Sequence, residues 1–124
     1  MERWIPVNDI PEGLYLDELI DDHQGVSLSL RGEDSDRVLR IEFGLHVLSY
    51  QSTAEHCVLK TLDNNASLNV PWSLFTSTQT DYINLLVEES YKIIDSEIKI
   101  HYLIKHADGI INVISRQAPR VKWT

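Results

Sequence analysis

The chain has a single cysteine, no long apolar run and no excess of basic residues, and each absence excludes something. Cys57 cannot form a disulfide within the chain because it has no partner. No apolar stretch approaches the roughly 20 residues of a membrane-spanning helix, and the first residues lack the basic start and apolar block of a signal peptide. We therefore expect a cytoplasmic protein without membrane contact.

Motifs for catalysis, cofactors and metals are also missing. The chain contains neither of the glycine-rich patterns GxxxxGK[ST] and GxGxxG, which hold phosphates. His101 and His106 are five residues apart, so a regular strand places them on opposite faces and they cannot bind one ion together. Cys57 has no flanking motif that marks a nucleophile, and a buried, inert thiol is expected. The sequence predicts no enzyme, no cofactor and no metal site.

Charge is the most informative property of this sequence. The 124 residues carry a net charge of −8, with 43% hydrophobic and 24% charged residues, which is typical of one folded domain spanning residues 1–124. Residues 1–36 contain ten acidic and two basic residues (2 − 10 = −8), whereas residues 37–124 contain nine of each. This balance disfavours nucleic acid and anionic membranes, which require clustered lysine and arginine. It favours a basic protein, whose approach an acidic surface accelerates.

We predict that acidic residues of the first third form a contact surface for such a partner, with aromatic side chains as packed anchors. The carboxylates are Asp17, Glu18, Asp21, Asp22, Glu33, Asp34 and Asp36, and the aromatics are Trp4 and Tyr15. The alternative explanation is that the acidic balance only keeps the protein soluble.

The hydrophobic pattern predicts an α+β fold, an antiparallel β-sheet packed by one main helix. Alternation of apolar and polar residues predicts strands over 26–31 and 37–50, with a bend or bulge at Gly44. Residues 14–22 fit a strand or a short helix, and we favour the strand. An apolar stripe at helical spacing predicts the helix over about residues 79–94.

A C-terminal β-hairpin over residues 97–116 is the strongest local prediction. Apolar residues alternate with polar ones on both sides of Asp108-Gly109, a pair that tolerates positive φ in a type I′ turn. With these two residues as the loop, Ile104 lies opposite Val113, so that the apolar faces meet.

Three stretches of the C-terminal half carry a resemblance to a known group of proteins. They are Trp72-Ser73-Leu74-Phe75, then residues 81–91 (DYINLLVEESY), and finally residues 100–104 (IHYLI) with residues 109–114 (GIINVI), closing near Pro119. Over about residues 72–119 the chain resembles small bacterial immunity proteins of polymorphic toxin systems, including those of contact-dependent growth inhibition.

The resemblance implies a cytoplasmic protein that binds one cognate toxin domain and blocks its active site. Many such toxins are nucleases with basic substrate grooves, which suits an acidic partner. It implies no particular binding residues, so the residues chosen above rest on charge alone. Two alternatives stay open. One is a non-catalytic interaction or adaptor domain, homodimeric through a sheet edge or the helix face. The other is an enzyme or small-molecule binder whose site is assembled from scattered residues.

Overall fold

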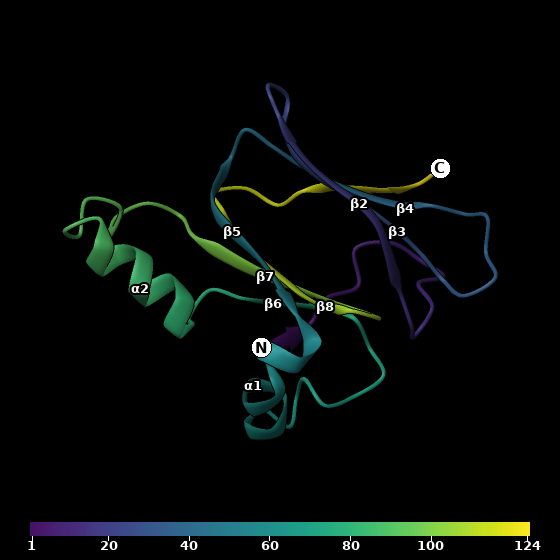
Figure 1. Ribbon diagram of the computed structural model, residues 1–124. Helices are drawn as coiled ribbons and strands as arrows, with labels where there is room; N and C mark the ends of the chain where they lie inside the picture. Colours follow the sequence, from purple (N-terminus) through teal and green to yellow (C-terminus); the bar gives the residue numbers. More distant parts are fainter.

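The computed structural model describes all 124 residues and contains two antiparallel β-sheets that pack against each other (Figure 1). Sheet A consists, in spatial order, of β1 (Glu2–Arg3), β6 (Leu74–Ser77), β7 (Ile100–His106), β8 (Gly109–Ser115) and β5 (Val47–Ala54). Sheet B consists of β2 (Tyr15–Asp22), β3 (Gly25–Arg31), β4 (Leu39–Gly44) and β9 (Arg120–Trp123). The chain crosses from one sheet to the other between β4 and β5.

The main core lies between the two sheets and follows from the alternation of side chains along each strand. Every second residue of β3 and β4, such as Leu28, Leu30 and Ile41, points away from solvent and is buried. These side chains meet Ile104 and Val113 of sheet A in one cluster. Each fully buried leucine or isoleucine contributes about 1.5–3 kcal/mol relative to exposure, so this layer holds the sheets together.

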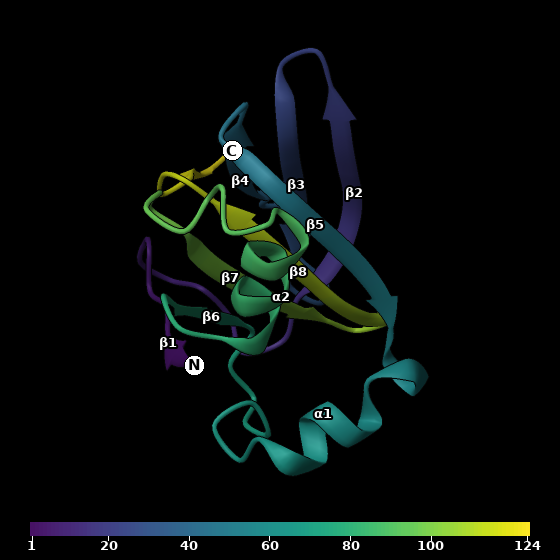
Figure 2. The same cartoon turned by 90° about the vertical axis from the view of Figure 1, so that its left-hand side faces the viewer.

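Sheet A is also covered on its outer face, by α2 (Asp81–Glu89) and, further along, by η1 (Glu55–Cys57) and α1 (Leu59–Asn64) (Figure 2). Ile83 and Val87 of α2 pack on Ile114 of β8. Because β7 and β8 are covered on both faces, most of their positions are buried, including the polar His101 of β7 and Ser115 of β8. None of these helices has the length and apolar character needed to cross a membrane.

The α+β class is confirmed, and the structure corrects several details. The predicted single sheet is two sheets, because the chain turns at Gly44, with φ of +65°, and residues 37–50 contribute strands to both. Residues 14–22 contain the strand β2. The predicted helix over residues 79–94 is shorter and ends at Glu89, where a series of turns begins.

The predicted C-terminal strand pair is present, but its loop and register differ from the prediction. Ala107 and Asp108 form the loop, so Ile104 pairs with Ile111 instead of Val113. A shift of two residues keeps every side chain on its face, so the apolar faces still meet. Gly109 is not at positive φ; it is required because a Cβ atom there would lie 2.1 Å from the Thr53 carbonyl oxygen of β5.

Candidate functional site

Most of the predicted contact residues lie along one free edge of sheet B. β2 has a strand neighbour on one side only, and it carries four of the carboxylates. The β3–β4 loop brings the other three beside the start of β2. We call this set the acidic edge: Tyr15, Asp17, Glu18, Asp21, Asp22, Glu33, Asp34 and Asp36. At about 3.3 Å per residue, β2 alone extends over about 23 Å.

The carboxylates of the acidic edge are largely free of basic partners. Only Asp17 forms an ion pair, in which its Oδ2 lies 2.8 Å from the Nε of Arg31. The other salt bridges of the chain involve Glu42 or Glu97 and none of the remaining six carboxylates. Six of the seven carboxylates therefore have no basic side chain within ion-pair distance.

The opposite edge of sheet B has the opposite charge. Arg40, Arg120 and Lys122 surround Glu42 on the outer face of β4 and β9. Partial desolvation raises the pKa of Glu42, but the Arg40 hydrogen bond and the nearby Lys122 outweigh it, so that pKa lies below its usual value. Sheet B is therefore acidic along β2 and basic along β9, a separation that orients an approaching charged protein.

At the β3–β4 end, the acidic edge borders an open hollow of about 600 Å³. Tyr15, 44% exposed, lies beside it, together with Asp17 and the loop carboxylates. Asp34 has a left-handed backbone with φ of 55°, a conformation that aspartate tolerates better than most residues. This end combines an exposed aromatic ring with several negative charges.

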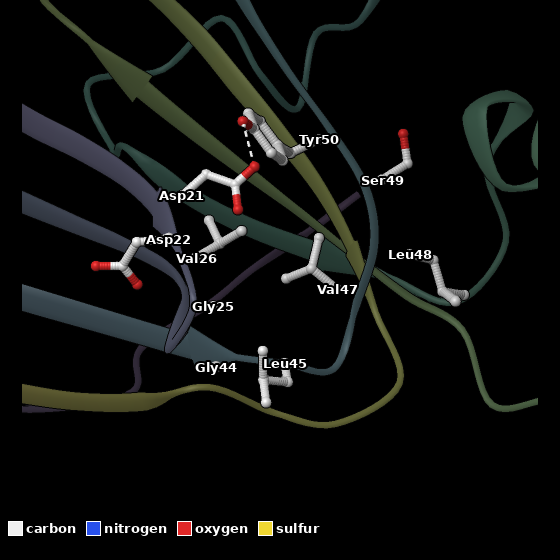
Figure 3. A pocket seen from close by; sticks show the side chains of 10 residues that line it. All are labelled: Asp21, Asp22, Gly25, Val26, Gly44, Leu45, Val47, Leu48, Ser49 and Tyr50. Atoms are coloured by element: carbon white, nitrogen blue, oxygen red, sulfur yellow. Dashed lines mark hydrogen bonds between the residues drawn. The ribbon is translucent and has the colours of Figure 1, made fainter.

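At the other end of β2, an open cleft of about 330 Å³ separates the two sheets (Figure 3). Asp21 and Asp22 border it from the β2–β3 hairpin, and β5 borders it from sheet A. The Tyr50 hydroxyl of β5 donates a hydrogen bond of 2.9 Å to Asp21 Oδ2. This bond raises the pKa of Tyr50. Val26 and Val47 give the cleft apolar walls between the sheets.

Trp4 lies apart from the acidic edge, and its role as an anchor stays a prediction. Its ring packs against Tyr102, with ring centroids 4.8 Å apart, at the core between the sheets. Its backbone carbonyl accepts a 3.2 Å hydrogen bond from Trp72 Nε1. Trp4 is therefore half-buried against the core between the sheets.

The sequence pattern missed the most exposed apolar side chains of the molecule. Tyr91 is 92% exposed, Ile93 79%, Leu45 72% and Ile98 70%. Periodicity assigned Tyr91 and Ile93 to the helix and Ile98 to the inner face of the hairpin. No local signal marks Tyr91 and Ile93, because their exposure results from the end of α2 at Glu89. Cys57, expected to be buried, is exposed.

No arrangement of side chains suited to metal binding is present. The structure has no group of three His, Cys, Asp or Glu side chains placed to hold an ion. His101 is buried, and its ring nitrogens lie 2.8 Å from Thr80 Oγ1 and 2.7 Å from Asn112 Oδ1. Burial lowers its pKa. Because Thr80 is also the N-cap of α2, accepting from the Ile83 N–H, this histidine ties the helix to sheet A.

Comparison with known proteins does not add a family to this description. Neither the family models, nor the curated proteins, nor the solved structures contain a match to this chain.

Proposed function

We propose that this chain is an immunity protein that binds a basic toxin domain, most simply a nuclease, and blocks its active site with the acidic edge. The observation that supports this proposal is a set of six carboxylates without ion pairs, three on the free strand β2 and three on the adjacent β3–β4 loop. A groove that binds phosphates is lined by lysine and arginine, and a row of fixed carboxylates is complementary to it. The protein acts by occupying the groove and needs no chemistry of its own.

The acidic edge also disfavours self-association through β2. A free strand edge offers unpaired N–H and C=O groups to any other chain, and charged side chains are the common protection against such pairing. Two copies meeting along β2 would bring Asp17, Glu18 and Asp22 of each chain together. The same charges attract a basic partner, so the edge selects for the toxin and against a second copy.

The test uses the C-terminal domain encoded by the gene immediately upstream as the toxin, purified and titrated with this protein. A triple reversal on the edge, Glu18→Lys with Glu33→Lys and Asp36→Lys, should slow association at least tenfold at low salt. It should also flatten the dependence of the association rate on salt. Stopped-flow fluorescence measures both.

A matched triple reversal far from the edge provides the control. Glu2, Glu55 and Asp63 are exposed and lie on β1, η1 and α1. Their change to lysine alters the net charge equally and should change the association rate less than twofold. Equal slowing by both triples would show that only net charge matters. If the wild-type chain neither binds the toxin domain nor restores growth on co-expression, the proposed function is wrong.

A further inference from the structure

The turn that ends α2 holds a tyrosine where glycine is the favoured residue. The Lys92 N–H donates to the Val87 carbonyl (2.8 Å) and the Tyr91 N–H to the Glu88 carbonyl (3.0 Å), the pattern of a Schellman motif. Tyr91 occupies the left-handed position of that motif, with φ of 54°, and Lys92 follows with φ of 64°. A side chain at that position is less favourable than glycine, and the exposed ring of Tyr91 gains no packing in return.

The segment after this turn is held in place by several hydrogen bonds. The Lys99 ammonium donates to the carbonyls of Ile94, Asp95 and Glu97 at 2.9, 2.9 and 2.6 Å. The Glu97 carboxylate lies 3.3 Å from the Arg116 guanidinium. The turn therefore presents its exposed side chains from an ordered backbone, which lowers the entropic cost of binding.

Three of the exposed apolar residues follow one another along the turn after α2. Hydrogen bonds from the Ile93 N–H to the Ser90 carbonyl (3.1 Å) and from the Glu97 N–H to the Ile94 carbonyl (3.0 Å) hold this segment in successive turns. We call this surface the apolar ridge: Tyr91, Ile93 and Ile98.

We propose that the apolar ridge is the anchoring part of the toxin interface, with Tyr91 as its central contact. This inference rests on the proposed function. Exposed apolar patches with a polar rim mark interaction sites, and tyrosine is enriched among the residues that dominate binding energy. Retaining an aromatic ring at an unfavourable backbone position is the kind of local strain found at functional sites.

The charges around the ridge indicate a basic partner and not a second copy. Glu88, Glu89 and Asp95 lie in or beside this turn without ion pairs. Residues 88–99 contain four acidic residues and two basic ones, Lys92 and Lys99, so the segment has a net negative charge. In a symmetric contact with a second copy, these carboxylates would face the same carboxylates of the other chain and repel them. An apolar patch of the toxin flanked by lysine or arginine is complementary.

Two ridge variants test the inference with the same upstream toxin domain. In Tyr91→Gly, removal of the ring should weaken affinity at least tenfold, mainly through faster dissociation, while the midpoint of chemical denaturation rises. The double variant Ile93→Ser with Ile98→Ser should weaken affinity similarly. Leu59→Ser is the matched control, because Leu59 is an exposed apolar residue of α1 away from the ridge, and its affinity should stay within twofold.

The outcomes separate this inference from the proposed function. If the wild-type chain binds the toxin domain and both ridge variants bind equally well, the ridge assignment is wrong while the acidic edge stands. If the wild-type chain does not bind, both are wrong. A wild-type dimer that Tyr91→Gly converts to a monomer would assign the ridge to self-association and overturn the choice of partner.

Discussion

Gly109 provides the sharpest test of how the sheets are assembled, because the sequence and the structure give different reasons for it. The sequence suggests a glycine needed for positive φ in the hairpin loop. The structure shows ordinary φ and a close approach of β5, with a Cβ atom at Gly109 only 2.1 Å from the Thr53 oxygen. We predict that Gly109→Ala forces the end of β5 away from β8.

The size of this effect follows from the contacts that must change. Real Cβ atoms do not approach closer than 3.0 Å, so the backbone of β5 has to move by about an ångström. Overpacking of this kind costs about 1–3 kcal/mol. The bond from the Glu55 N–H to the Asp108 carbonyl, 3.0 Å long, is lost or lengthened, at about 1 kcal/mol. The sum of about 2–4 kcal/mol lowers the melting temperature of a chain this size by roughly 8–15 °C.

Thermal and urea denaturation followed by circular dichroism measure this loss. Gly13→Ala is the control, because Gly13 has open space around its Cβ position and no positive φ. We expect it to be neutral or to stabilise by up to about 1 kcal/mol. Gly109→Asn separates the two reasons, since asparagine tolerates positive φ but still needs room for its Cβ. If Gly109→Asn is as stable as the wild type, or if Gly109→Ala matches Gly13→Ala, the packing explanation is refuted.

Two further predictions concern buried polar groups. Burial lowers the pKa of His101 and of His106, so the folded state takes up protons less readily than the unfolded state. The free energy of unfolding should therefore be highest above the ordinary histidine pKa of about 6.5 and should fall as the pH drops below it. Urea titrations at decreasing pH measure this slope, and His101→Gln should make it shallower; an unchanged slope would contradict the assignment. Lys105 donates to the carbonyls of Leu68 and Val70 at 2.6 Å each. The variant Lys105→Met should therefore lose about 1–2 kcal/mol of stability and show faster amide exchange in residues 66–72. Unchanged exchange would show that these bonds do not hold that loop.

The sequence by itself determined which segments form strands and where the negative charge lies. Alternation with a period of two is a local property, so β3, β4 and the β7–β8 hairpin could be read directly from the order of residues. The grouping of carboxylates in the first third was equally visible. The order of strands in sheet B is what makes β2 a free edge. Only the structure shows that β2 carries four of the carboxylates beside the loop that carries three more.

The tertiary structure decided the features that depend on contacts between distant residues. Strand pairing is chosen by burial on both sides of a sheet, so residues 37–50 contribute one strand to each sheet and Trp4 packs against the core. The close approach of β5 to Gly109 is a contact between distant residues, which no pattern near the hairpin encodes. The same holds for the exposed tyrosine at the end of α2, because a helical pattern continues past Glu89 while the backbone leaves the helix. Local periodicity identifies the elements, whereas their partners and ends are set by long-range packing.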